Sequence, residues 1–185
     1  MGYSKSDKEA THTRIVKVAA KRFRELGIEG IGVADVMKEA GVTVGGFYKH
    51  FESRDELVVE ALATAFHDLD RWEEHTDTLT EALKNYLTED HRDAPGTGCA
   101  LGALLGDMTR ASRSAKAVYT ERLKRTLANS AGLVPLKGNS DKRARAILTI
   151  SAMLGAINLS RAVSDPSLSR EILQRTRDEL ISLNN

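Results

Sequence analysis

The segment at residues 43–51 limits most strongly what this chain can fold into, because its composition opposes the structure that its pattern indicates. Gly45 and Gly46 are adjacent, and each costs a helix about 1 kcal/mol relative to alanine. A helix of about seven residues is also too short to persist alone in water. We therefore expect residues 44–50 to form a helix that depends on packing. Its buried side would consist of Val44, Phe47 and Phe51.

The outer side of this short helix is rich in hydrogen-bond donors. Thr43 precedes it and is a good N-cap, because a threonine hydroxyl can accept from the next backbone amides. Helix N-terminal amides favour anions such as phosphate, and glycine permits close approach of another molecule. Tyr48, Lys49 and His50 add a phenol, an ammonium and an imidazole. This combination is typical of the recognition helix of a helix-turn-helix unit, which enters the major groove of DNA.

Two helices are predicted before the recognition helix. Apolar residues recur at helical spacing from about residue 7 to 26, where Gly27 provides a left-handed stop, and again at residues 33–40 before Gly41. The whole chain carries a formal net charge of only +1. Nucleic-acid binding therefore requires a local basic surface, and Lys and Arg are frequent in the first 54 residues. Within the N-terminal arm, Lys5 and Lys8 are candidates for minor-groove or phosphate contacts.

The rest of the chain is also predicted to be helical, which makes the protein all-α with about nine helices. Three prolines in 185 residues fit long uninterrupted helices. Capping patterns at Ser53 and Thr78 mark two helix starts, and a break at residues 133–139 and Pro166 mark two more. We expect a helix-turn-helix domain at 1–53 and a helical effector-binding and dimerisation domain at 54–185. The further helices are expected at 54 to beyond 72, 78–89, 99–111, 113–130, 140–164 and 167–183.

Several classes of protein are disfavoured by what the sequence lacks. No stretch approaches the roughly 20 apolar residues that span a bilayer, so we expect a cytoplasmic protein without membrane contact. The motifs G-x-S-x-G and H-E-x-x-H and a phosphate-binding P-loop are absent, and we expect no enzyme activity. Cys99 is the single cysteine, and His67 and His75 lack a third ligand at a recognisable spacing. We therefore expect neither a bound metal nor another cofactor.

The run GVTVGGFYKHFESRDEL at residues 41–57 resembles the signature of the TetR family of bacterial regulators. The resemblance covers residues 10 to about 66, and the rest of the chain matches in length and helix count. It implies a homodimeric regulator, usually a repressor, that binds a palindromic operator in double-stranded DNA. It further implies that a small-molecule effector enters the C-terminal body and releases the DNA.

The resemblance also assigns roles to individual residues. It implies phosphate contacts from Tyr48, His50 and Arg54. Two positions depart from the family pattern, because Gly32 replaces a Ser or Thr cap and Arg54 replaces the commoner lysine. The residues expected to face the groove are Thr43, Val44, Gly45, Gly46 and Lys49, with Val33 and Ala34 from the preceding helix.

The body offers candidate sites with competing interpretations. Cys99 follows Gly98 at a predicted helix start, where it is either a reactive electrophile sensor or a small packed side chain. A stripe of small residues on the predicted helix at 140–164 fits either a dimer interface or internal packing, and consists of Ala152, Gly155, Ala156 and Leu159. Residues that either line an effector pocket or fill the core are Phe66, Tyr86, Cys99, Leu104, Met108, Tyr119 and Met153. The alternative function is that of a helical protein-binding adaptor without DNA binding.

Overall fold

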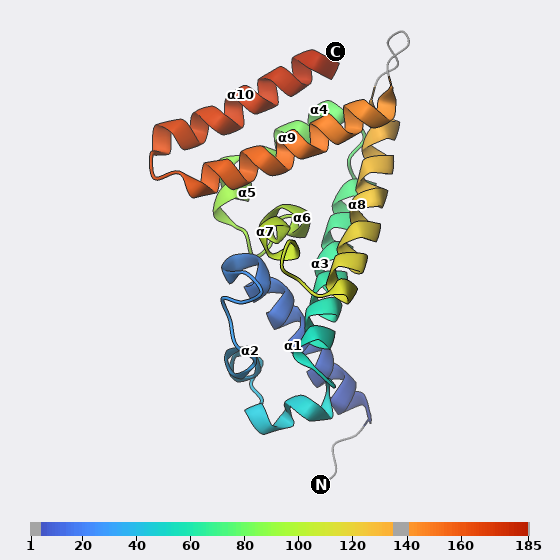
Figure 1. Cartoon of the computed structure of the whole chain (residues 1–185), viewed down its shortest axis with the longest axis vertical. Coiled ribbons are helices and arrows are strands. Elements are labelled where there is room, and N and C mark those ends of the chain that lie inside the picture. The colour runs from blue at the N-terminus through green and yellow to red at the C-terminus, as the bar shows by residue number, and fades with distance from the viewer. Residues whose placement is uncertain (1–4, 135–140, 185) are drawn as a thin grey trace.

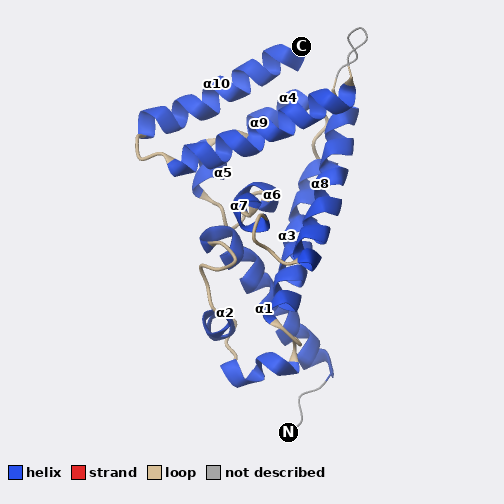
Figure 2. Cartoon of the chain, in the orientation of Figure 1, coloured by secondary structure: helices blue, strands red, loops and turns tan. Residues whose placement is uncertain are grey.

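A computed structural model describes residues 5–134 and 141–184, and every regular element within these ranges is a helix, as predicted (Figure 2). Eleven helices are described where about nine were expected. They are α1 (Lys5–Leu26), α2 (Val33–Glu39), η1 (Val44–Lys49), α3 (Arg54–Glu74), α4 (Leu79–Tyr86), α5 (Glu89–Asp93), α6 (Ala100–Ala103), α7 (Leu105–Met108), α8 (Arg113–Leu133), α9 (Lys142–Ala162) and α10 (Pro166–Asn184).

Local capping chemistry sets the starts of α3 and α4 at the predicted positions. The Ser53 hydroxyl accepts from the Glu56 amide at 3.1 Å, and Thr78 accepts from the Glu81 amide at the same distance. The two extra helices have different origins. Thr88 caps α5, which begins where the predicted helix at 78–89 was expected to end. The predicted helix at 99–111 is divided into α6 and α7, because the backbone at Leu104 has ψ 8°, outside the α-helical range. Most of the predicted break at 133–139 lies outside the described residues.

The helices are arranged around one long axis (Figure 1). At one end α1, α2 and η1 form the helix-turn-helix unit, and at the other end α9 and α10 lie across the molecule. Between the two ends α3 and α8 run side by side, and α3 also packs along α1. The single helix α3 therefore packs against both the helix-turn-helix unit and the body helix α8. No described helix is both long enough and apolar enough to cross a membrane.

The recognition element differs from the prediction in its detailed geometry. η1 is a 3-10 helix, which is the tighter form used in short pieces. The Thr43 side chain makes no capping hydrogen bond, because the turn closes instead through the Gly46 amide and the Thr43 carbonyl at 3.0 Å. Val44 is 52% exposed, so the prediction that it lies on the buried side is wrong. Phe47 and Phe51 alone provide the buried side.

Candidate DNA interface and ligand cavity

Two stacked aromatic rings hold η1 against the rest of the head. Phe47 and Phe51 are buried with ring centroids 5.3 Å apart, and His12 of α1 stacks on Phe51 at 4.6 Å. Packing thus offsets the poor helix propensity of the two glycines. Tyr48, which follows Phe47 directly, is 80% exposed and projects into solvent.

The predicted groove-facing residues gather on the exposed surface of the helix-turn-helix unit. Val44, Gly45 and Lys49 are exposed on η1, Gly46 is half-buried, and Thr43 is exposed just before η1. From α2, Ala34 is exposed and Val33 is half-buried, while Lys5 is exposed at the start of α1. A methyl group added at Gly45 would meet no atom within 4 Å, so the fold itself leaves this position open.

His50 lies half-buried at the end of η1, and its Nδ1 atom has no hydrogen-bond partner among the described residues. Burial lowers the pKa of His50, and the electrostatic influence of the nearby His12, Lys8 and Lys49 lowers it further. His12 itself contacts the Glu60 carboxylate at 2.6 Å. A neutral imidazole at His50 can offer one N–H to a phosphate but carries no charge with which to attract it.

Arg54, a predicted phosphate contact, is engaged within the chain. Its guanidinium donates to the Glu29 carboxylate at 2.8 Å and to the Ile28 carbonyl, and so ties the start of α3 to the loop before α2. A phosphate at Arg54 would have to share this group with Glu29. Gly32 is the N-cap of α2 and makes no capping hydrogen bond, because glycine has no side chain.

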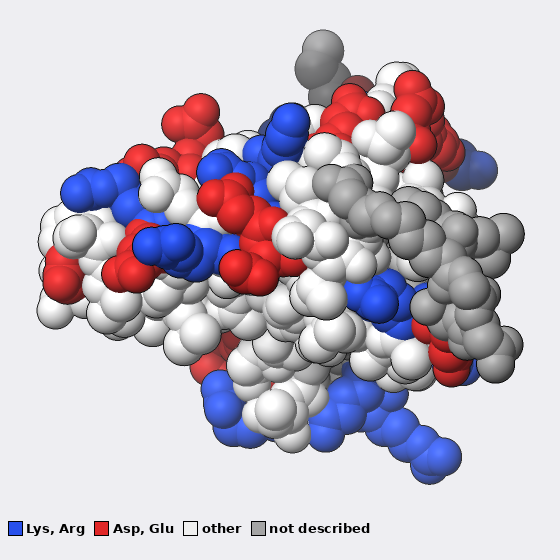
Figure 3. All heavy atoms as spheres, turned by 90° about the horizontal axis from the view of Figure 1, so that it is seen from above, with Lys and Arg blue, Asp and Glu red and all other residues white. Residues whose placement is uncertain are grey.

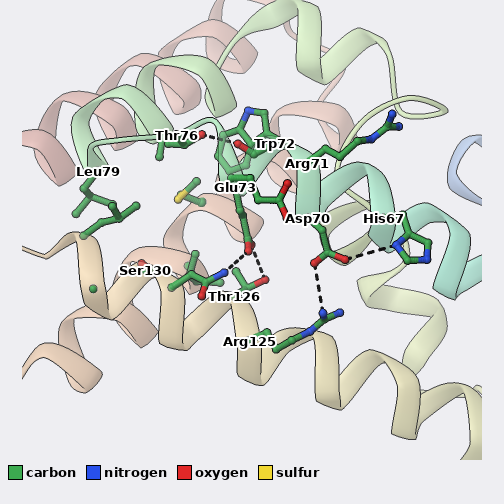
Figure 4. Close-up of a pocket in the computed structure, with 17 residues that line it drawn as sticks. His67, Asp70, Arg71, Trp72, Glu73, Thr76, Leu79, Arg125, Thr126 and Ser130 are labelled. Carbon is green, nitrogen blue, oxygen red and sulfur yellow. Dashed lines mark hydrogen bonds and ion pairs between the residues drawn. The ribbon is translucent and has the colours of Figure 1, made fainter.

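The body contains a cavity of about 660 Å³ between α3, α4, α8 and α9 (Figure 4). One part of its wall is apolar and includes Trp72, the only tryptophan of the chain. The other part carries charged and polar groups from α3 and α8. The lining residues are His67, Asp70, Arg71, Trp72, Glu73, Glu74, Thr76, Leu79, Ala82, Arg125, Thr126, Asn129, Ser130, Gly132, Leu133, Ile150 and Met153.

A buried ion-pair network forms the polar wall of this cavity. Arg122 is only 1% exposed and lies 2.9 Å from Glu73 Oε1. Glu73 also accepts hydrogen bonds from Thr126 Oγ1 at 2.9 Å and Asn129 Nδ2 at 2.6 Å, which satisfies its carboxylate. Asp70 has weaker contacts, because Arg122 and Arg125 each approach it only to 3.5 Å.

Most of the predicted effector residues lie outside this cavity. Only Met153 lines it, while Tyr86 and Cys99 line smaller adjacent pockets that also include Trp72. The others are core residues, because their side chains fill the contacts between α3, α6, α7 and α8; these are Phe66, Leu104, Met108 and Tyr119.

Cys99 sits in an environment that disfavours its thiolate form. Burial raises the pKa of Cys99, and it also raises the pKa of Tyr86 well above its ordinary value. His91 accepts a hydrogen bond from the Cys99 amide at 3.0 Å and contacts the Tyr86 carbonyl through its other nitrogen at 2.7 Å. Since the thiolate is the reactive form, this geometry favours the packed interpretation of Cys99 over the sensor interpretation.

The sequence carried a signal for the polar wall that our prediction missed. Asp70 and Glu73 are three residues apart on one predicted helix, and Arg122, Thr126 and Ser130 are four apart on another. Spacing of three or four residues places side chains on one face of a helix. Each of these two helices therefore carries polar residues on one face. Because both helices must be partly buried, we would expect the two polar faces to lie against each other.

The outer surfaces of α9 and α10 carry exposed apolar side chains. Leu159 is 58% exposed, and a methyl group added at Gly155 would meet nothing within 4 Å. Ala152 is half-buried, whereas Ala156 is 4% exposed and packs inside its own chain, so it does not belong to this surface. Figure 3 views the end of the molecule away from the helix-turn-helix unit, where Lys and Arg mix with Asp and Glu around uncharged surface. The other exposed apolar residues of α9 and α10 are Ile147, Leu148, Leu168 and Leu183.

Polar contacts of Ile28 and Arg24 join the head to the body. Asp107 of α7 accepts a hydrogen bond from the Ile28 amide at 3.0 Å, just after the left-handed turn at Gly27. Arg24 of α1 is buried, donates to the Gly98 carbonyl at 3.2 Å and lies 3.6 Å from the Asp68 carboxylate. Burial lowers the pKa of Arg24. These contacts fix the end of α1 against the segment that follows α5.

Comparison with known sequences agrees with this architecture. Residues 15–61 match the family model described as "Bacterial regulatory proteins, tetR family". The chain is 30% identical over 144 residues to the uncharacterized HTH-type transcriptional regulator Rv2912c of Mycobacterium tuberculosis. The aligned region covers 74% of this chain and 68% of that protein. It is 29% identical over 124 residues, 67% of its own length, to the HTH-type transcriptional repressor KstR2 of Rhodococcus jostii. The match spans 55% of KstR2.

Solved structures share the fold over almost the whole chain. A TetR transcriptional regulator from Chloroflexus aurantiacus superposes with a TM-score of 0.81 at 20% identity, covering 96% of this chain and 95% of the other. The reduced form of NemR from E. coli gives a TM-score of 0.78 at 17% identity, covering 94% and 96%. The sequence relatives and the fold agree with the signature at residues 41–57. This chain belongs to the TetR family of bacterial regulatory proteins.

Proposed function

We propose that this protein is a transcriptional repressor that binds a palindromic operator as a homodimer and releases it when a small molecule enters its body. Residues 1–53 would bind DNA, and residues 54–185 would bind the effector and the second protomer. The observation that carries the proposal is the exposed glycine-rich end of η1, held rigidly by buried Phe47 and Phe51 beside exposed Tyr48 and Lys49.

The DNA contacts divide into two kinds. Tyr48, His50 and Lys49 offer donors to phosphates, which fix the register of the head without reading sequence. Gly45 and Gly46 let the backbone approach the base edges, and Val44 offers an apolar contact to a thymine methyl group. Because few side chains at the leading end can hydrogen-bond to bases, affinity should depend strongly on phosphate contacts.

Dimerisation would use the outer surfaces of α9 and α10. Leu148, Gly155 and Leu159 lie on one side of α9, and Gly155 leaves room for a neighbouring helix. Two heads must be about 34–36 Å apart to reach successive major grooves. A dimer formed by the ends of the bodies away from the heads would leave both heads free to meet DNA.

The ligand response would pass through α3 and α7. A ligand in the cavity touches the last turns of α3, while the first turn of α3 holds the head loop through Arg54. To act as an inducer, the ligand must bind the DNA-incompetent arrangement more tightly than the DNA-bound one. The raised pKa of Cys99 favours a non-covalent ligand over an electrophile.

Selection of bound duplexes from a random DNA pool tests the central claim. The expected result is enrichment of a palindromic sequence, with an affinity that falls steeply as salt rises because counterions are released. Lys49→Ala should reduce both the affinity and the salt slope, whereas Lys84→Ala on α4 serves as a matched control that changes neither. Failure to enrich any sequence at low salt would refute DNA binding and favour the protein-binding adaptor.

A further inference from the structure

We propose that the cavity between α3, α4, α8 and α9 binds amphipathic organic amines, with the protonated amine at Asp70 and the apolar body along Trp72 and α9. This inference rests on the proposed ligand response and names the chemical class of its ligand. Its support comes from the shape of the cavity, the long contacts of the Asp70 carboxylate and a buried Ser130 hydroxyl that has no hydrogen-bond partner among the described residues.

The cavity is suited to a ligand with one apolar part. Its volume of about 660 Å³ falls within the range of small-molecule sites in proteins. Trp72 and Leu79 come from the end of α3 and the start of α4, and Ile150 and Met153 come from α9. An aromatic ring or alkyl chain in this part of the cavity would leave water and gain contact with apolar side chains.

The Asp70 carboxylate can accept further hydrogen bonds. Its contacts with Arg122, Arg125 and His67 measure 3.5, 3.5 and 3.8 Å, and it forms no hydrogen bond with any residue that the structure describes. Glu73, by contrast, has three close partners. Figure 4 shows Asp70 extending from α3 toward Arg125, whose exposed side chain can turn into solvent. An ammonium group at Asp70 would give this carboxylate the short charge-assisted hydrogen bonds that it lacks.

Ser130 provides a second polar contact at the same site. Its side chain is 6% exposed and lines the cavity, yet its Oγ atom has no hydrogen-bond partner within residues 5–134 and 141–184. A buried hydroxyl without a partner costs free energy that a ligand group can recover. The hydroxyl can accept from an N–H group of the ligand.

The balance of charge around the cavity disfavours an anionic ligand. Asp70, Glu73 and Glu74 all line it. Of the two lining arginines, Arg71 pairs with Asp68 at 2.6 Å and points away from these carboxylates (Figure 4). Arg125 is the other lining arginine, and Arg122, which lies behind the wall 2.9 Å from Glu73 Oε1, does not line the cavity. With Glu73 offset by Arg122 and Arg71 offset by Asp68, a ligand carboxylate would meet Asp70 and Glu74 against Arg125 alone.

Fluorescence of Trp72 tests this proposal directly, because the only tryptophan lines the cavity. The full-length protein is titrated with 6-phenylhexylamine, 6-phenylhexanol and 6-phenylhexanoate, which share one apolar body and differ in the charge of the head group. We expect the amine to bind about tenfold more tightly than the alcohol, and the carboxylate to bind most weakly. Excitation at long wavelength avoids absorption by the phenyl group.

Three variants identify the residues responsible. Asp70→Asn should remove the advantage of the amine and leave the affinity for the alcohol unchanged, which also reports that the cavity is intact. Asp77→Asn removes one charge just beyond α3, outside the cavity wall, and should retain the full preference. Ser130→Ala should weaken both the amine and the alcohol severalfold.

The outcomes separate this proposal from the proposed function. Equal or tighter binding of the carboxylate, or an unchanged amine preference in Asp70→Asn, would overturn the assignment of the ligand class and leave the ligand response standing. No change in Trp72 fluorescence with any of the three compounds would overturn both the ligand class and the cavity as effector site. DNA binding is measured separately by duplex selection, and its result does not depend on the outcome of the ligand titrations.

Discussion

Gly45→Ala should make this protein more stable and a weaker DNA binder at the same time. Gly45 has no positive φ, and a methyl group built there meets no atom within 4 Å. Alanine therefore fits the folded backbone without strain and reduces the freedom of the unfolded chain. If Gly45 lets the backbone of η1 approach the DNA bases closely, the added methyl group would occupy the space of the base edges and weaken binding.

The magnitudes follow from these two effects. A compatible Gly→Ala substitution raises the free energy of unfolding by about 0.4–1 kcal/mol. For a chain of this size that corresponds to an increase in Tm of about 1–4 °C. Disturbing the contact to one base pair costs about 1–3 kcal/mol of binding, which is about a five- to 150-fold loss of operator affinity.

Gly41→Ala is the matched control for this experiment. Gly41 also has no neighbouring atom within 4 Å of an added methyl group, but its φ is +70°. The left-handed conformation costs a non-glycine residue about 1–2 kcal/mol. We therefore expect Gly41→Ala to lower the free energy of unfolding, in contrast to Gly45→Ala.

Urea denaturation and operator binding are measured for both variants at one fixed protomer concentration, since dimerisation makes apparent stability depend on concentration. Destabilisation by Gly45→Ala would mean that the fold requires this glycine. An unchanged operator affinity in a stabilised Gly45→Ala protein would mean that DNA does not approach η1 at this point. Either result refutes the reasoning.

Three further perturbations test the interior. Burial lowers the pKa of His91 below its ordinary value of 6.5, so the unfolded chain binds more protons near and below that pH and the free energy of unfolding falls on acidification. Urea denaturation at pH 7.5 and 5.5 should therefore reveal a smaller fall in His91→Gln than in the wild type. The exposed control His67→Gln should show the same fall as the wild type. Arg122→Ala leaves Glu73 buried without its cation and should cost about 3–5 kcal/mol of unfolding free energy, and a loss below about 1 kcal/mol in urea would contradict the buried ion pair. Asp107→Ala removes the acceptor of the Ile28 amide, should cost about 1–3 kcal/mol in the same assay, and should weaken the effect of a bound ligand on operator affinity measured by titration.

The features that the sequence predicted well are those decided within a few residues. The start of α3 depends on Ser53 and Glu56, three positions apart, and the hydrogen bond between them forms as expected. Gly27 and Gly41 end their helices in the left-handed conformation, with φ of 79° and 70°. Such local chemistry is readable from one sequence because the interacting groups are chain neighbours.

The cavity was not predicted because it depends on contacts between distant segments. Asp70 and Arg122 are far apart in the chain, and only the pairing of α3 with α8 brings their charges to 3.5 Å. The same limit applies to α9, where Ala152, Gly155 and Ala156 are all small enough for a helix interface. Packing alone decides that Ala156 faces its own core while Gly155 faces outward.

A small displacement in the cavity would be sufficient for the proposed release of DNA, because α3 is one uninterrupted helix between the cavity and the head. Its 21 residues extend about 30 Å, so a tilt of about 5° moves one end by about 2–3 Å relative to the other. Hydrogen bonds to bases and phosphates tolerate much less than this displacement. Asp107 holds the Ile28 loop to α7 independently of α3. A ligand that tilts α3 away from α8 must therefore either carry α7 with it or strain the Asp107 contact, and each alternative disturbs the position of the head.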